Sequence, residues 1–371
     1  MSAGVDYDLH GVVGVRLLEA SAADAAAVDR QLGPLRAPLS REPDITLRFS
    51  DSLPAPESLV YIGLNDAAFT PEAFYILKGK HKSSVKVRLP FEQLGGPVEL
   101  LCERGLPAVP LLIALVNLTA LCKGLLPLHA TAFEYNGGNL ITGWSKGGKT
   151  ETLLAFMAQG ARYIGDEWVY IGAGGARLYG IPEPIRVWDW HLAQMPRYRQ
   201  ALPPRDRLRL RSVSLLAGAL AGAGKARLLR RTPLGRLGRS LAPALLRQGY
   251  AHLPPHQTFG AGNCPLEGGF DRLFFVASRP APGVEVRPID PLEVARRMAH
   301  SLVEERRDLL SYYQKFRFAF PERKNELLEG FESLQREALL KALAGKPAYA
   351  VYHPYPVSLP ALYEAMRPYC S

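Results

Sequence analysis

The sequence predicts an α/β protein in two parts: a small α+β domain over residues 1–105 and a larger domain with a mixed sheet over residues 106–371. Short apolar segments between Pro, Gly and Asp breaks fill the first part. In the second part, a strand, a glycine-rich loop, a helix and another strand follow one another between residues 138 and 171. A chain of 371 residues, 47% hydrophobic and 22% charged, is long enough for about two or three globular domains.

Five N-terminal segments have the β-branched or alternating pattern of strands. They are GVVGVRLL (11–18), DITLRFS (44–50), SLVYIGL (58–64), AFYILKG (73–79) and SVKVRLPF (84–91). An apolar run from Leu106 to Leu128 follows, interrupted by polar residues and bracketed by prolines. We expect a buried helix over Val109–Cys122 there, with no transmembrane segment. A hydrophobic hairpin lying against a partner is the alternative.

The cysteine pattern and the N-terminus favour a cytoplasmic protein. The four cysteines are far apart and form no CxxC pair, so reduced thiols are expected. The opening residues MSAGVDYDLHGVVGV have no basic leader followed by an apolar core, and therefore no export signal is predicted.

Two apolar runs joined by NGGN predict a β-hairpin over residues 129–144, because Asn and Gly tolerate positive φ angles. A turn on Asn136 and Gly137, or one residue later, places His129 opposite residues 144–146. His129 is therefore expected beside the glycine-rich loop. It is either a site residue or a structural histidine.

Gly143, Gly148, Lys149 and Thr150 fit the pattern GxxxxGK[ST], with a strand before it and a helix over 150–159 after it. Loop amides and the helix N-terminus suit phosphate oxygens, Lys149 can reach the β and γ groups, and Thr150 can hold Mg²⁺. The alternative is a glycine-rich turn that arose by chance. The predicted nucleotide-binding residues are Gly143, Trp144, Ser145, Lys146, Gly147, Gly148, Lys149, Thr150 and Glu151.

An acidic pair, Asp166 and Glu167, follows only one helix after Lys149. We expect its strand to return beside the strand that precedes the loop, with its end near the phosphates. The two side chains should face opposite ways unless the backbone bends at Gly165. A carboxylate there can accept the proton of an incoming hydroxyl, and Asp166 is our preferred base. Activation of water by two acids with Mg²⁺ and an exposed pair at a strand end are the alternatives.

The C-terminal third contains further regular elements. DRLFFVAS (271–278) and VEVRPI (284–289) flank PAPG and predict a hairpin. Asp290, Pro291 and Glu293 have the order of an N-cap, a first-turn proline and an acid at the third position, which predicts a long helix. A strand over 347–352 and a helix over 359–366 are expected to close the chain.

The block LPLHATAFEYNGGNLITGWSKGGKTETLLAFMAQGARYIGDEW (126–168) resembles the HPr kinase/phosphorylase-like family of bacterial serine kinases. The shared features are LHA before the hairpin, a glutamate after GK[ST], a small residue closing the helix and an acidic pair soon after. YGIPEPIRV (179–187) is similar to the stretch that follows in HPr-kinase-related proteins. The resemblance implies a phosphoenolpyruvate-carboxykinase-like phosphate-loop core.

The resemblance also implies roles for individual residues. ATP would bind residues 143–150, with Lys149 on its phosphates and Mg²⁺ at Thr150. The base would be Asp166 or Glu167, and His129 would tune the site. Glu167 is also a candidate Mg²⁺ ligand.

Glu183 would be a further metal ligand and Arg186 a phosphate-side group, unless the two form only a solvated salt bridge. The sequence departs from the family at Trp144 and Lys146, where small or acidic residues are common, and in having DE where the best-known members have DD. The signature around the family's phosphorylase site is absent, and the N-terminal domain is only weakly similar. Neither phosphorylase activity nor the protein HPr as acceptor is therefore implied.

Residues 207–266 contain ten Lys and Arg and no Asp or Glu, and we expect a basic insertion or lid there. The stretch 207–247 suits an acidic partner, while a membrane surface, nucleic acid or a merely solvated segment are alternatives. Trp188 and Trp190 either stack on adenine or a substrate or, as their apolar setting favours, pack in the core.

Taken together, the residues predict an ATP- and Mg²⁺-dependent kinase that transfers the γ-phosphoryl group to a hydroxyl on a protein, peptide or small molecule. An ATP-binding scaffold or sensor without phosphotransfer is the second hypothesis. A kinase for free serine or a natural-product alcohol is the third. The family resemblance makes a homo-oligomer plausible.

Overall fold

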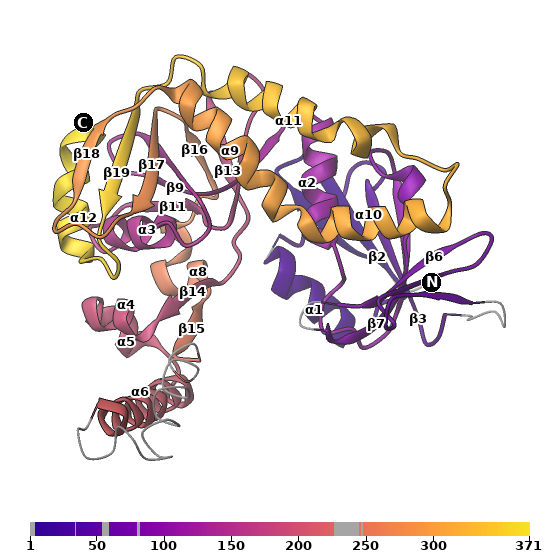
Figure 1. The fold of residues 1–371 in the computed structure, drawn as a ribbon, viewed down its shortest axis with the longest axis horizontal. Helices are drawn as coiled ribbons and strands as arrows, with labels where there is room; N and C mark the ends of the chain where they lie inside the picture. Colours follow the sequence, from indigo (N-terminus) through magenta and orange to yellow (C-terminus); the bar gives the residue numbers. More distant parts are fainter. Residues whose placement is uncertain (1–3, 34, 54–58, 80–81, 226–244, 246–247) are drawn as a thin grey trace.

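The computed structural model describes residues 4–33, 35–53, 59–79, 82–225, 245 and 248–371. Within these residues the chain forms two large mixed sheets and one small ribbon, with helices around them. Figure 1 shows the N-terminal sheet on the right and the second sheet on the left, with α9 and α11 running across the top. The predicted α/β class is confirmed.

The N-terminal sheet has eight strands in the described residues, and all five predicted segments contribute strands to it. Its helix α1 (Ala22–Leu32) begins with a capping box between Ser21 and Asp24. In spatial order the strands are β1 (Val5–Leu9), β2 (Val13–Leu18), β3 (Ile45–Ser50), β8 (Val98–Glu103), β7 (Ser84–Arg88), β6 (Phe74–Lys78), β5 (Ala67–Phe69) and β4 (Val60–Ile62).

The second sheet contains the candidate site. Its strands, in spatial order, are β16 (Glu267–Gly269), β13 (Arg177–Gly180), β12 (Trp168–Ile171), β9 (Leu126–Glu134), β10 (Gly138–Thr142), β17 (Arg272–Ser278), β19 (Ala348–His353) and β18 (Glu285–Pro288). A further strand, β11 (Arg162–Gly165), pairs with β9 on the same side as β12. The strands β10, β17 and β19 are parallel to one another, so their carboxyl ends lie at the same edge.

Two strand pairings differ from the sequence predictions. Thr142 lies opposite Ala130 in the β9–β10 hairpin, so His129 falls opposite Gly143 and one position short of the predicted range. In addition, β17 and β18 do not form a hairpin, because β19 lies between them and pairs with both. A local turn signal such as PAPG cannot show that a later strand will be inserted between its two flanks.

Side chains that alternate along the strands of the second sheet pack into two cores, one on each face of the sheet. Leu140 and Phe275 belong to a core that continues into the N-terminal sheet, whereas Ile141 and Phe274 face the opposite core. On the first face lie α2 (Leu112–Cys122), α9 (Pro291–Glu305) and α11 (Glu326–Leu343), and on the other lie α3 (Lys149–Met157) and α12 (Leu359–Met366). Asp290 caps α9 by accepting from the Leu292 backbone N–H at 2.9 Å, as its sequence predicts.

After the second sheet is largely complete, the chain returns to the N-terminal sheet through α10 (Arg307–Ala319). The ring of Phe316 lies 5.3 Å from that of Phe91 and 6.0 Å from that of Phe74. Asn325 is buried, and its Nδ2 donates to the carbonyl oxygens of Phe91 and Leu94, each at 2.8 Å. The helices α10 and α11 therefore cover strands that were predicted to belong to a separate domain.

A smaller unit lies below the second sheet in Figure 1. It comprises α4 (Asp189–Gln194), α5 (Pro196–Ala201), α6 (Pro204–Lys225), α8 (Pro255–Phe259) and the ribbon of β14 (Ile185–Trp188) with β15 (Tyr250–Leu253). Of the predicted basic insertion, residues 226–244 and 246–247 lie outside the described part of the chain. None of the helices in the described ranges is both long and apolar enough to cross a membrane.

Candidate active site

The glycine-rich loop connects the end of β10 at Thr142 to the start of α3 at Lys149. Gly143 and Gly148 have φ angles of 155° and 109°. A Cβ on Gly143 would lie 2.3 Å from the carbonyl oxygen of Val276, and one on Gly148 would lie 2.1 Å from Nε2 of His353. The loop can therefore take this shape only with glycine at both positions.

Lys149 lies at the N-terminus of α3, where no side chain in the described structure caps the helix. Its buried Nζ donates to the carbonyl oxygens of Gly143 and Trp144, each at 3.1 Å. Burial lowers the pKa of Lys149, although the carboxylates of Glu167 and Asp166 oppose the shift. A cation and the first-turn N–H groups of a helix thus meet at one point, as an anion site requires.

Asp166 lies between β11 and β12 and is only 3% exposed. Its Oδ2 accepts a hydrogen bond from the Thr150 hydroxyl at 3.2 Å. Burial, together with the charge of Glu167, raises the pKa of Asp166 to about 7, against the opposing effects of Thr150 and Lys149. The acidic pair was predicted to approach the loop, and Asp166 does so at Thr150.

The strand that precedes Asp166 does not lie where we expected. It was expected beside β10, but β11 pairs with β9, because β9 and β17 occupy the two sides of β10. The strand is interrupted at residues 166–167, between β11 and β12, where Glu167 has a φ of 66°. This bend directs Asp166 to Thr150 and Glu167 to His129.

His129 lies between two carboxylates. Its Nε2 is 3.1 Å from Oε2 of Glu167, and its Nδ1 is hydrogen-bonded to Oε1 of Glu305 at the end of α9. Burial opposes protonation of His129, but these two bonds outweigh it and raise its pKa. The same hydrogen bond lowers the pKa of Glu167, whose side chain is 52% exposed. Both groups are thereby held as an ion pair.

Sequence reasoning missed Glu305, His191 and His353. His191 donates from Nε2 to Oε1 of Glu151 at 3.2 Å, and His353 places its Nε2 2.9 Å from the carbonyl oxygen of Gly147. Only His353 had a sequence signal, since it ends a strand expected in the same sheet and carboxyl ends of parallel strands share one edge. Glu305 and His191 are contributed by helices with no motif linking them to the loop.

Two of the three predicted metal ligands, Thr150 and Glu167, are bonded to different partners. Thr150 meets Asp166, whereas Glu167 meets His129, and the described residues contain no cluster of three or more His, Cys, Asp or Glu suited to a metal ion. Mg²⁺ beside a nucleotide commonly takes one or two carboxylates and the phosphates, and the Thr150 hydroxyl and the ionised Glu167 are oxygen donors of the kind that it takes. Glu183 is half-buried. Burial raises the pKa of Tyr163, and the charges of Asp166 and Glu183 add to this effect.

Arg186 is exposed on β14, with its guanidinium 4.8 Å from the ring centroid of Tyr250. Its positive charge also favours the ionised form of Glu167. The side chains of Trp188 and Trp190 are half-buried. Trp190 packs against the core on the α3 face of the sheet, as favoured for it, whereas the ring of Trp188 lies 5.6 Å from that of Tyr250. Trp144 is exposed on the loop.

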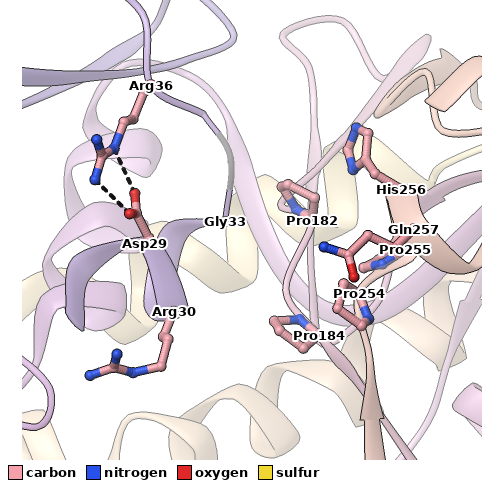
Figure 2. Close-up of a pocket in the computed structure, with 10 residues that line it drawn as sticks. All are labelled: Asp29, Arg30, Gly33, Arg36, Pro182, Pro184, Pro254, Pro255, His256 and Gln257. Atoms are coloured by element: carbon pink, nitrogen blue, oxygen red, sulfur yellow. Dashed lines mark hydrogen bonds and ion pairs between the residues drawn. The ribbon is translucent and has the colours of Figure 1, made fainter. Parts of the chain in front are cut away.

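A cavity of about 440 Å³ lies between α1 and the segment that carries Glu183. Figure 2 shows one wall made of Asp29, Arg30, Gly33 and Arg36 and the other made largely of prolines. The two walls approach each other at Gly33, where an added Cβ would lie 2.8 Å from the ring of Pro182. Pro182 and Pro184, which line the cavity, flank Glu183 in the sequence, so the cavity adjoins this predicted metal ligand.

The sequence matches no protein-family model and no curated protein. The candidate site is therefore defined by its geometry. A glycine loop and Lys149 offer the hydrogen-bond donors and positive charge that suit an anion, and two carboxyl groups stand beside them in different chemical states. Asp166 is poised to exchange a proton near neutral pH, while Glu167 is held ionised.

Proposed function

We propose that the protein is an ATP-dependent phosphotransferase of the HPr-kinase-like type, with a phosphoenolpyruvate-carboxykinase-like core. It transfers the γ-phosphoryl group of ATP to a hydroxyl on a protein, peptide or small molecule. The observation that carries the proposal is the 3.2 Å contact between Asp166 and the hydroxyl of Thr150, next to Lys149 and the glycine loop. A carboxyl at this place lies within reach of the terminal phosphate of a bound nucleotide.

The loop residues bind and orient the triphosphate. Backbone N–H groups of residues 143–150, at the N-terminus of α3, donate hydrogen bonds to the phosphate oxygens. Lys149 exchanges its two carbonyl partners for phosphate oxygens. Thr150 and Glu167 would hold Mg²⁺, which neutralises charge on the β and γ oxygens when it is bound. His129 and Glu305 keep Glu167 ionised and in place.

Asp166 is the proposed base and Glu167 the proposed metal ligand. A base must take up a proton near working pH, and the buried Asp166 has a pKa of about 7. A metal ligand must stay ionised, and Glu167 is paired with His129. Asp166 already accepts a hydrogen bond from one hydroxyl, that of Thr150. A carboxyl oxygen there can therefore also accept one from the hydroxyl of the substrate that receives the phosphoryl group.

The proposal is tested with purified protein, γ-labelled ATP, Mg²⁺ and three acceptor pools: cell metabolites, short serine peptides and the proteins encoded by adjacent genes. Label should move to an acceptor with the wild-type chain and with Lys341→Ala, an exposed lysine of α11. Lys149→Ala should abolish the transfer, because its ammonium group is lost from the phosphate site. An unchanged rate in Lys149→Ala would remove the loop from the reaction.

The same experiment separates the other hypotheses. A scaffold or sensor would bind ATP without labelling any of the three pools. A small-molecule kinase would label metabolites alone, such as free serine or a natural-product alcohol. Label on a peptide or protein identifies the class of acceptor directly.

An acidic acceptor or partner is part of the proposal because of α6. Arg205, Arg207 and Arg211 are exposed on this helix, next to the exposed Leu208 and Leu215. Such a surface attracts anions and is weakened by salt. The KM for the acceptor should therefore rise with ionic strength more steeply than the KM for free serine, and equal salt dependence would exclude α6 as a docking surface.

A further inference from the structure

Two aromatic side chains, one exposed and one half-buried against the core, form a pair beside the phosphate loop. The ring centroids of Trp190, in α4, and Tyr355, after β19, are 5.7 Å apart, with an interplanar angle of 85°. Tyr355 is 55% exposed and Trp190 is half-buried. Gln194 fixes the two segments together, since it accepts from the Leu359 N–H at 2.8 Å and donates to the Val357 carbonyl at 3.3 Å.

Both aromatic residues are neighbours of groups that hold the loop. Two residues before Tyr355, His353 contacts the carbonyl oxygen of Gly147. Next to Trp190, His191 is bonded to Glu151, which follows the GKT sequence. The charge of Glu151 also acts on Tyr355, whose pKa is raised chiefly by burial. The aromatic pair is thus anchored at two points to the phosphate loop.

Sheet order fixes the side of the loop on which the pair lies. The loop leaves β10; the acidic pair is carried by β11 and β12 beyond β9, while His353 and Tyr355 follow β19 beyond β17. The carboxyl groups and the aromatic pair therefore flank the loop on opposite sides. A nucleotide whose terminal phosphate lies near Asp166 has its nucleoside directed toward the other side.

We propose that Trp190 and Tyr355 bind the base of the nucleotide, with the purine ring stacked on the exposed ring of Tyr355 and in contact with Trp190. The inference rests on the proposed function, since it assumes a triphosphate on the loop. Aromatic faces bind bases by stacking with little dependence on base identity, so ATP and GTP should both bind. Trp188 is not part of the platform, because its ring packs against that of Tyr250 in β15, 5.6 Å away, whereas Trp190 packs against Tyr355.

The test compares ATP with inorganic tripolyphosphate, which offers the loop three phosphates but no base. Binding of each to the full chain is measured by calorimetry with Mg²⁺ for wild type, Trp190→Ala, Tyr355→Ala and the control Trp188→Ala. We expect Trp190→Ala and Tyr355→Ala each to weaken ATP about tenfold, in line with base stacking on aromatic residues. Tripolyphosphate affinity should stay within about twofold in both, and Trp188→Ala should leave both ligands unaffected.

Each outcome separates the platform from the loop. An equal loss of affinity for ATP and tripolyphosphate, or no loss of affinity for ATP, would overturn the base platform while leaving the proposed function intact. Wild-type protein that binds neither ligand would overturn both proposals. If Trp190→Ala is unfolded by thermal melting, Tyr355→Ala decides, because its side chain is more than half exposed. Photolabelling with 8-azido-ATP gives a second readout and should modify peptides containing residue 190 or 355.

Discussion

Nε2 of His353 lies 2.9 Å from the carbonyl oxygen of Gly147, while Nδ1 lies 2.8 Å from that of Pro354. The ring is buried and fills the space next to Gly148. The shape of the phosphate loop thus depends on a residue 206 positions later in the chain.

The first prediction concerns Gly148→Ala. Its Cβ would lie 2.1 Å from Nε2 of His353, so the loop or the histidine must move, and ATP affinity should fall at least about tenfold. Gly160→Ala is the matched control, because Gly160 also has a positive φ, 87°, but no atom within 4 Å of the new Cβ. It should lose only about 1–2 kcal/mol of stability and bind ATP normally. Calorimetry and thermal melting distinguish the two variants, and equal ATP affinity would refute the role of His353.

The second prediction separates the two acids. Asp166→Asn removes the proton acceptor and should lower the transfer rate about 10²- to 10⁴-fold, with ATP affinity near normal. Glu167→Gln removes the ionised oxygen and should raise the Mg²⁺ concentration needed for half-maximal activity about 10- to 100-fold. Rates measured across a Mg²⁺ series test both. The assignment fails if saturating Mg²⁺ rescues Asp166→Asn and does not rescue Glu167→Gln.

The third prediction tests Glu305 as a positioning residue. Glu305→Gln removes one of the two carboxylates that favour the charged form of His129, so the pKa of His129 should fall. The bond between His129 and Glu167 weakens as a result, and the Mg²⁺ concentration needed for half-maximal activity should rise about tenfold. Glu304→Gln is the control, since Glu304, in α9, pairs with the exposed Arg307 at the start of α10. NMR titration of the histidine ring gives a readout independent of activity, and an unshifted His129 would contradict the role.

The fourth prediction concerns pH and the contact between the two sheets. Nε2 of His10 lies 2.8 Å from the carbonyl oxygen of Gly180, and burial lowers the pKa of this histidine below its ordinary 6.5. The unfolded chain therefore binds the proton more tightly than the folded one. The free energy of unfolding contributed by His10 should be complete above pH 6.5 and decrease as the pH falls below it.

Urea unfolding of the wild type and His10→Asn at pH 5 to 8 measures this contribution. Asn tolerates the positive φ of 54° at residue 10, and taking the difference between the two proteins cancels the other histidines. The difference in unfolding free energy should shrink on acidification. A difference that is constant with pH would show that His10 is not buried as a neutral ring.

Local patterns predicted much of the fold. The loop, the helix after it, the N-cap at Asp290 and the helix Leu359–Met366 follow from short-range preferences for turns, caps and spacing, and all are present. Strand neighbours were less predictable. The insertion of β19 between β17 and β18 is decided by burial of the whole sheet and leaves no signal in PAPG.

The candidate site was predictable where its residues are close in sequence. Lys149, Thr150 and Asp166 are separated by one helix, and the structure joins Thr150 to Asp166. His129 was expected near the loop, but its partner Glu305 is 176 positions away, and such a contact exists only once both sheets and α9 are assembled. Distant partners of this kind carry no local pattern.

The path of the chain has a practical consequence. The polypeptide leaves the N-terminal sheet after β8, builds most of the second sheet, returns through α10 and α11, and then adds β19 to the second sheet. A protein truncated after residue 105 would expose Phe74 and Phe91 to water, and one lacking residues 1–105 would expose Phe316. A cut at residue 105 therefore leaves neither fragment with a closed interior, so either half made alone should aggregate.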